Sequence, residues 1–328
     1  MLALVPIQWW HWVSFVLVII FFLALDLGVF HRRAHVVPFK EALFWTLVCF
    51  GMAMVFALTL IPVRGRNEAE DFLQGYLIEL SLSMDNVFVM AMIFCYFAVP
   101  ECYQHRVLFW GVLGALIARG LMIWLGTELV RSYHWTFYIF GVFLVMTALK
   151  MLLREDEEVH PDKNPVIRWV RRVCPVTKNY DGQKLFQWQG GRLFLTPLAL
   201  VLVLVESMDI VFALDSIPAV FGVTQDRFII FTSNVFAILG LRSLYFVLAN
   251  AIAYFQYLKY GLAAVLIFIG FKMLIVDWIK VPSAWSLAVV AGIILGAIGG
   301  SVFAARRQWG RLLARDISPP PGQPGNAA

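Results

Sequence analysis

Charged residues are scarce in this chain. Asp, Glu, Lys and Arg together make up 14% of its 328 residues, whereas hydrophobic residues make up 61%. Soluble globular proteins average about 25% charged and about 45–50% apolar residues. This composition, with a mean hydropathy of +0.79, excludes a soluble enzyme, a disordered chain and a nucleic-acid-binding protein. We therefore expect an integral membrane protein whose surroundings are the lipid bilayer.

Cysteine and histidine are also few, which limits the metal sites that the chain can build. The four cysteines have no metal-site spacing, and all six histidines fall outside the long apolar runs or at their edges. Haem, copper and zinc sites within the membrane are therefore not expected. Because no cofactor motif or catalytic constellation appears, we expect neither an enzyme nor a resident cofactor.

Long apolar runs dominate the sequence. A bilayer core of about 30 Å needs about 20 apolar residues per helix, and the strands of a membrane barrel would be about ten residues long with alternating polarity. The runs here have helical length and are apolar on all sides. They predict an all-α integral membrane protein with about nine transmembrane helices near 13–30, 40–61, 74–97, 107–126, 136–153, 196–219, 228–248, 261–279 and 285–305.

The distribution of basic residues predicts the orientation. Lys and Arg cluster after the first, fifth and ninth runs, at 32–40, 154–195 and 306–315, and all three clusters fall on one side of a nine-span chain. On the other side, Arg64 and Arg66 are matched by nearby acids. By the positive-inside rule, the N-terminus is outside and the C-terminus is cytoplasmic.

The same pattern divides the chain into two parts. Residues 1–305 form the predicted transmembrane transporter domain, with a cytoplasmic loop at 154–195. Residues 306–328 form a cytoplasmic tail that is rich in Pro and Gly near its end and is expected to be disordered.

An internal repeat relates residues 74–153 to residues 196–279. The segment SMDNVFV (83–89) matches SMDIVFA (207–213), 124 positions later, and two further matches at offsets of 123 and 122 pair Arg119 with Arg242 and Lys150 with Lys272. A unit of three spans is odd, so the second copy crosses the membrane in the opposite sense. Such three-plus-three inverted repeats are typical of secondary transporters. A duplication for structural reasons is the alternative.

Acidic residues interrupt the third and sixth spans. The candidate metal-site residues there are Glu79, Asp85, Asn86, Glu206, Asp209 and Asp215. Each acid costs about 2.5–3.5 kcal/mol at a helix centre, so five unpaired acids would exceed the net stability of a typical domain. Arg119 and Arg242 can balance two charges. The other three carboxylates are expected to be protonated, solvated in a cavity or paired with a bound cation; alternatively, acids and arginines pair only to hold the bundle.

The chemistry of these side chains favours a hard cation. Carboxylate, amide and hydroxyl oxygens suit Mg²⁺, Ca²⁺ or Mn²⁺. On a continuous helix Glu206 and Asp215 would face opposite sides. Pro218 therefore predicts a kink or unwinding near 214–218 that would let the two acids converge, because the proline ring clashes with the carbonyl of Leu214.

These motifs resemble those of the TerC family of integral membrane proteins, in particular its Alx-type bacterial members. The resemblance covers about residues 10–305 and rests on four segments of this sequence: ELSLSMDNVFV, VESMDIVFALDSIPAVFG, SNVFAILGLRSLYF and KYGLAAVLIFIGFKMLIVD. It implies a manganese exporter of the bacterial inner membrane, related in architecture to the LysE-type transporters, in a family named for its association with tellurite resistance. It also implies that the acidic residues named above form the metal site.

The functional hypothesis is therefore export of Mn²⁺ through a midplane acidic site. Asp85, Asp209 and Asp215 would bind the metal with help from Glu79, Asn86 and Glu206, while Arg119 and Arg242 would balance charge. Protons should compete with metal for carboxylates in a dehydrated site, which would allow proton coupling. The alternatives are transport of another divalent cation such as Ca²⁺, or a non-transporting factor in membrane-protein assembly or stress response. The oligomeric state is left open.

Overall fold

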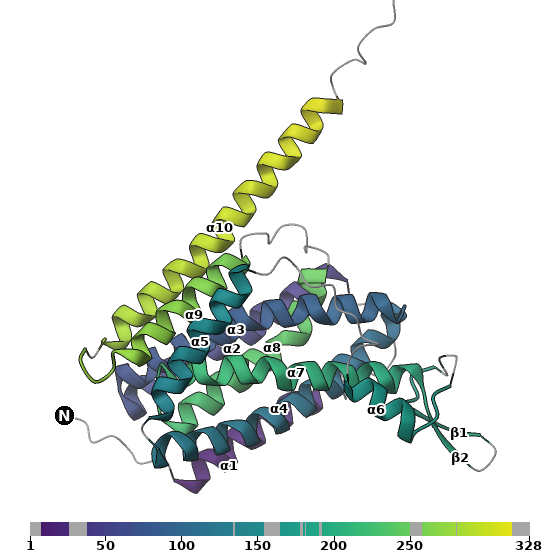
Figure 1. Ribbon diagram of the computed structural model, residues 1–328, viewed down its shortest axis with the longest axis horizontal. Coiled ribbons are helices and arrows are strands. Elements are labelled where there is room, and N and C mark those ends of the chain that lie inside the picture. The colour runs from purple at the N-terminus through teal and green to yellow at the C-terminus, as the bar shows by residue number, and fades with distance from the viewer. Residues whose placement is uncertain are drawn as a thin grey trace, which may run out of the picture.

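The structure is a computed structural model that describes residues 8–25, 38–133, 135–153, 165–177, 180, 182–189, 192–249, 258–279 and 281–316. The described residues are mostly helical. They form α1 (Trp9–Leu25), α2 (Phe39–Arg64), α3 (Arg66–Tyr96), α4 (Glu101–Ser132), α5 (Thr136–Leu153), α6 (Pro165–Val173), β1 (Phe186–Gln189), β2 (Arg192–Leu195), α7 (Pro197–Phe221), α8 (Arg227–Ala249), α9 (Leu258–Leu274) and α10 (Ser283–Asp316) (Figure 1).

Seven of these helices are long and apolar enough to cross a membrane: α2, α3, α4, α5, α7, α8 and the first part of α10. Each of the nine predicted runs overlaps a helix. However, α1 and α9 have only 17 residues each in the part of the chain that the structure describes. The membrane-protein prediction is therefore supported by seven candidate spans, and the count of nine stays a prediction.

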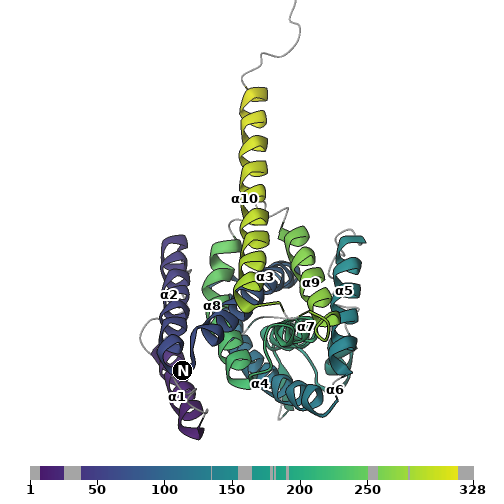
Figure 2. The same ribbon diagram turned by 90° about the vertical axis from the view of Figure 1, so that its left-hand side faces the viewer.

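The helices form a central bundle with a pair of helices on each flank. In Figure 2, α1 and α2 lie on one flank and α5 and α9 on the other, with α3, α4, α7 and α8 between them. The closest pairs within the bundle are α3 with α8 and α4 with α7, while α2 packs on α8 and α10 packs on α3 and α9. Segments that are far apart in sequence therefore meet in the centre of the molecule.

Helices α5 and α9 approach each other through glycines. A Cβ atom added at Gly270 would lie 2.8 Å from the backbone oxygen of Gly141 and 2.8 Å from Val145, and one added at Gly141 would lie 3.0 Å from the oxygen of Gly270. Ala148 and Ala263 on the same two helices are fully buried. Small residues let helix backbones pack closely in a bilayer, where contact between surfaces replaces the hydrophobic effect.

The loop at 154–195 contains regular structure that its irregular composition does not predict. Helix α6 buries Ile167 and Val170, and strands β1 and β2 form an antiparallel hairpin in which Phe186 pairs with Leu195. The loop ends at Thr196, whose side chain accepts a hydrogen bond from the backbone N–H of Ala199 and caps α7. This cap fixes where the sixth predicted span begins.

The C-terminal tail, predicted to be disordered, is helical in its first part. The sequence predicts disorder from residue 306, but α10 continues to Asp316. The reason is that residues 306–316 contain helix-forming Arg, Leu and Ala and no proline, so nothing ends the helix there. Residues 317–328 lie outside the described part of the chain.

Candidate metal site in the central bundle

Three charged side chains from three helices meet inside the bundle. Glu79 of α3, Arg119 of α4 and Asp209 of α7 have exposed fractions of 0%, 2% and 3%. The guanidinium of Arg119 forms an ion pair with Glu79 and a second, at 3.7 Å, with Asp209. One arginine therefore bridges an acid of α3 and an acid of α7, two helices far apart in the sequence.

Two polar side chains complete the surroundings of Arg119. Its Nη1 atom donates hydrogen bonds to Oγ of Ser216 on α7 and to Oδ1 of Asn234 on α8, both at 3.3 Å. All four central helices thus contribute to one polar cluster. Because a buried guanidinium carries five N–H donors, this set of acceptors is what permits its burial.

The balance of charge in this cluster is negative when its carboxylates are ionised. Two acids share one arginine, and removing one partner of a buried ion pair usually costs about 3–5 kcal/mol because the other charge is left uncompensated. From the sequence, Arg119 and Arg242 are expected to balance one acid each. The structure instead assigns Glu79 and Asp209 to the same guanidinium.

Glu206 lies on the same face of α7 as Asp209, one turn away, and the two carboxylates are close enough to interact electrostatically. Its carboxylate packs directly over Gly114 of α4, where an added Cβ atom would overlap both oxygens of Glu206. Glu206, Asp209 and Glu79 therefore gather along α4. Gly114 is essential to this arrangement, because it leaves the space that the carboxylate occupies.

Asp215, also on α7, lies away from the cluster around Arg119. Its Oδ1 atom accepts a hydrogen bond from Thr147 of α5 at 3.3 Å, so it faces the neighbouring helix pair. Of the predicted kink or unwinding near 214–218, the unwinding is wrong, because α7 is continuously helical from Pro197 to Phe221; the kink stays a prediction. Pro218 lacks the N–H that would bond to the carbonyl of Leu214, but α7 stays helical through this position, so Glu206 and Asp215 remain on different sides of the helix.

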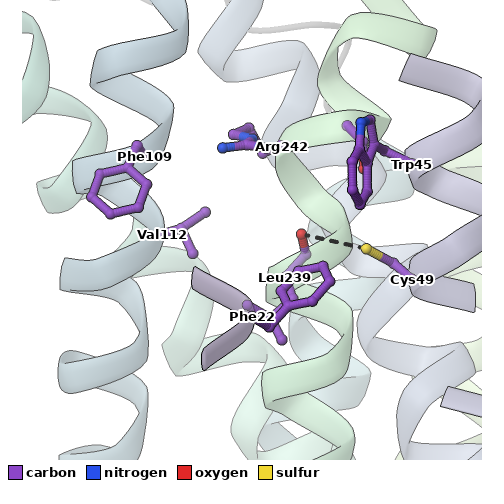
Figure 3. A pocket seen from close by; sticks show the side chains of 8 residues that line it. Phe22, Trp45, Cys49, Phe109, Val112, Leu239 and Arg242 are labelled. Carbon is purple, nitrogen blue, oxygen red and sulfur yellow. Dashed lines mark hydrogen bonds between the residues drawn. The ribbon is translucent and has the colours of Figure 1, made fainter. Parts of the chain in front are cut away.

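Three other predicted residues complete the set. Asn86, two turns after Glu79 on α3, is buried with 3% of its surface exposed. The side chain of Asp85 lies outside the described part of the structure. Arg242 does not join Arg119; it lines a separate small cavity with Cys49 of α2 and Val112 of α4 among its neighbours (Figure 3).

Several oxygen and nitrogen atoms near the cluster are buried with no hydrogen-bond partner among the described residues. They include Oγ of Ser81, Oγ of Ser83 and Nδ2 of Asn234. Hard hydroxyl and carboxylate oxygens are the donor set that divalent cations of the Mg²⁺, Ca²⁺ and Mn²⁺ class prefer. Within the described residues, however, no three His, Cys, Asp or Glu side chains are placed close enough to hold a metal ion. The metal-site assignment stays a prediction.

Sequence reasoning does not find two residues of this region. Gly114 and Thr147 appear in apolar runs as ordinary packing residues, yet one makes room for Glu206 and the other donates to Asp215. A small residue inside a membrane helix indicates close approach by a neighbour. That signal marks Gly114 as a contact point but does not name the group that approaches it.

Comparison with known proteins assigns the chain to a family. Residues 64–309 match the integral membrane protein TerC family. The chain belongs to the TerC family. The TerC match includes both repeats and every candidate metal-site residue.

Other TerC-like relatives align over nearly their whole length. An "Uncharacterized membrane protein STKORF319" of Myxococcus xanthus is 50% identical over 295 residues, which is 90% of this chain and 92% of the relative. The "Putative membrane-bound redox modulator Alx" of Escherichia coli K12 is 47% identical over 293 residues, covering 87% and 91%. A membrane protein of Rickettsia felis is 40% identical over 291 residues, covering 89% and 97%. No solved structure matches this chain.

Proposed function

We propose that this TerC protein is a secondary transporter that exports Mn²⁺ from the cytoplasm. The observation that carries the proposal is the buried cluster in which Arg119 joins Glu79 to Asp209. Ionisable side chains inside membrane spans are costly and mark ion or proton pathways. A purely structural pairing needs one acid for one arginine, whereas this cluster contains two acids and a third, Glu206, beside it.

The packing of the helices supports an inverted repeat. When the repeats are exchanged, α3 corresponds to α7, α4 to α8 and α5 to α9. The contact between α3 and α8 then corresponds to the contact between α7 and α4, and the contact between α5 and α7 to that between α9 and α3; all four contacts are present. The charged cluster lies between the two halves, where transporters with inverted repeats bind their substrate.

The remaining parts of the proposal follow from the resemblance and the charge pattern. The protein acts in a bacterial inner membrane with its N-terminus outside and its C-terminus in the cytoplasm, as the clusters of Lys and Arg favour. Mn²⁺ is its cargo. It needs no resident cofactor and performs no enzymatic reaction. Protons compete with the metal for the buried carboxylates, which allows inward proton flow to drive export.

Transport of Mn²⁺ into inside-out vesicles tests the proposal. Native protein should accumulate the metal, and Asp209→Asn should abolish uptake while leaving the amount of inserted protein unchanged. Glu128→Gln is the matched control, because Glu128 is an acid of α4 that pairs with Arg227 and is 60% exposed. Normal uptake by Asp209→Asn would overturn the assignment. Competition with Ca²⁺ in the same assay would reveal a transporter of another divalent cation.

A second candidate comes from the printed name of the Escherichia coli relative, which describes a redox modulator. A non-transporting role in redox balance, membrane-protein assembly or stress response would leave every divalent cation outside the vesicles. It would also predict that Mn²⁺ does not stabilise the purified protein against thermal unfolding. Absence of both effects in well-inserted native protein would favour this candidate.

A further inference from the structure

A row of polar residues connects the buried cluster to one end of the bundle. Along α3 it consists of Glu68, Asp71, Gly75 and Glu79, and Ser83 follows one turn beyond the cluster; the five are spaced three or four residues apart and therefore lie on one helical face. The facing helix α8 contributes Ser233 and Asn234, and Asp226 lies just before its first residue. We call these eight residues the polar seam. Helices α3 and α8 form one of the closest pairs of the bundle, so the seam is an interface between them.

The outer end of the seam is a group of acids that solvent can reach. Arg64 forms ion pairs with Asp226 and, at 3.6 Å, with Glu68, and both of these acids keep about a fifth of their side chains exposed. Asp71 interacts electrostatically with Glu68 and with Lys272 of α9, and its side chain also accepts hydrogen bonds from Ser283 and Thr224. Three acids are therefore held by two basic residues, which leaves an excess of negative charge.

The middle of the seam is narrow because of a glycine. A Cβ atom added at Gly75 would lie 2.9 Å from Oγ of Ser233, so this position lets the hydroxyl approach the α3 backbone. Ser233 is fully buried, and the next residue, Asn234, accepts a hydrogen bond from Arg119. The Ser233 hydroxyl donates to the backbone oxygen of Ile230 at 3.1 Å, so the seam runs from the exposed acids past the Gly75–Ser233 contact to the guanidinium that binds Glu79 and Asp209. From Asp71 to Glu79 the helix rises about 12 Å.

Buried polar atoms without partners point to a ligand in the seam. Oε2 of Glu68, Oδ1 of Asp71, Oγ of Ser83 and Nδ2 of Asn234 are all buried, and none has a hydrogen-bond partner among the described residues. Ser83 and Asn234 are also at least nine-tenths buried as whole side chains. Such groups in native proteins are normally satisfied by water or an ion. A seam that served only to join two helices would have no need of unsatisfied carboxylate and hydroxyl oxygens.

We propose that the polar seam is the route by which a hydrated divalent cation passes between the buried cluster and the side of the membrane where α3 begins. This inference rests on the proposed function and extends it, because it names the outward half of the pathway. The acids Glu68, Asp71 and Asp226 line the mouth, where their negative charge favours passage of the cation out of the buried cluster. Gly75 and Ser233 form the narrow section that opens when the two repeats move against each other.

Cysteine accessibility tests the seam without depending on net transport. Ser233→Cys and Val235→Cys occupy neighbouring positions of α8 with exposed fractions of 0% and 2% in the native chain, but only Ser233 lies in the seam. A small water-soluble thiol reagent is applied to either side of the membrane, with native protein as the background for its own four cysteines. We expect modification of Ser233→Cys from the α3-start side, slowed by added Mn²⁺, and little modification of Val235→Cys. Equal rates at the two positions, or no effect of Mn²⁺, would overturn the inference.

Vesicle uptake gives a second, separate test. The double variant Glu68→Gln/Asp71→Asn should lower the Mn²⁺ uptake rate by about tenfold, because the metal leaves the buried cluster through the seam into the vesicle lumen, and the negative charge of these acids favours a cation along that exit. Glu70→Gln is the matched control: Glu70 lies on the same turn of α3 but pairs with the exposed Arg66 at 2.8 Å. Native uptake by the double variant would refute the route while leaving the proposed transport intact. Absent uptake in native protein would instead refute the proposed function, and the cysteine result would still decide whether the seam admits the cation.

Discussion

Arg119 shows how one residue can decide the chemistry of a membrane protein. An isolated arginine in a helix centre costs about 2.5–3.5 kcal/mol on insertion scales. Here it is tolerated because two carboxylates, one hydroxyl and one amide oxygen surround it. The same contacts make Arg119 a competitor for any cation that binds Glu79 and Asp209. Release of one carboxylate from Arg119 is therefore a requirement for metal binding to that carboxylate.

Replacing Arg119 should lower the stability of the protein, and a second replacement at Glu79 should restore part of the lost stability. Arg119→Met leaves Glu79 and Asp209 buried without their cation and should lower the free energy of unfolding by about 3–5 kcal/mol. The double variant Arg119→Met/Glu79→Gln removes one of the uncompensated charges and should recover part of that loss. Thermal unfolding of the purified proteins in detergent measures both. Equal stability of Arg119→Met and the native protein would contradict the buried ion pairs.

Gly114 adds a prediction about the fit of Glu206. Gly114→Ala places a methyl group where the carboxylate of Glu206 lies, so the acid must move away from Asp209. We expect Mn²⁺ uptake to fall severalfold while the protein remains inserted, because an overpacked contact usually costs about 1–3 kcal/mol, less than a typical domain's stability. Gly51→Ala is the control, since nothing lies within 4 Å of its added Cβ atom. Unchanged uptake by Gly114→Ala would show that the position of Glu206 is irrelevant to transport.

At the level of elements, the molecule is held together by helix pairs that join residues 74–153 to residues 196–279. The α3–α8 and α4–α7 pairs build the central bundle, and α5 meets α9 on its flank. The α5–α9 pair depends on the close approach of Gly141 and Gly270. Since lipid is as apolar as the helix surfaces, such packing supplies much of the association energy within a membrane.

Enlarging one of these glycines should separate α5 from α9. In Gly270→Ala the new methyl group would lie 2.8 Å from the oxygen of Gly141, so the backbones must move apart. We expect a loss of about 1–3 kcal/mol of stability, typical of overpacking. Gly292→Ala on α10 has nothing within 4 Å of the added atom and should leave stability unchanged or slightly higher. A melting temperature for Gly270→Ala equal to that of Gly292→Ala would argue against a tight α5–α9 contact.

At the scale of the whole molecule, the number of membrane spans depends on α1 and α9: it is seven without them and nine with them. Counts of seven and nine spans are both odd and place the chain ends on opposite sides of the membrane. The segment after α9 distinguishes them, since it lies outside only if α9 crosses. Trp278, which follows α9, is 79% exposed and Trp285, near the start of α10, is 71% exposed, as expected of residues at a membrane surface.

Reporter fusions test this arrangement. Alkaline phosphatase, active only outside the cytoplasm, should be active when fused after Ile279 and inactive when fused after Asp316. A fluorescent protein that folds only in the cytoplasm should give the opposite pattern. Inactive phosphatase after Ile279 together with active phosphatase after Asp316 would contradict this arrangement, because it would mean either that α9 does not span the membrane or that the orientation is reversed.

The sequence alone determines the membrane class, the approximate position of every long helix, the TerC membership and the small set of polar residues available for function. These features are readable because they depend on composition and on local periodicity, such as the shared face of Glu79 and Asn86. A local rule fails in part at Pro218, which predicts a kink or unwinding near 214–218, whereas α7 is helical through this segment.

Only the tertiary structure decides which polar residues meet. Periodicity fixes the direction of a side chain around its own helix but not the rotation or the partner of that helix in the bundle. For this reason the sharing of Arg119 by Glu79 and Asp209, the contact of Glu206 with Gly114, and the separation of Asp215 toward α5 do not follow from the sequence. Each depends on helices distant in sequence packing side by side, which is a property of the whole bundle.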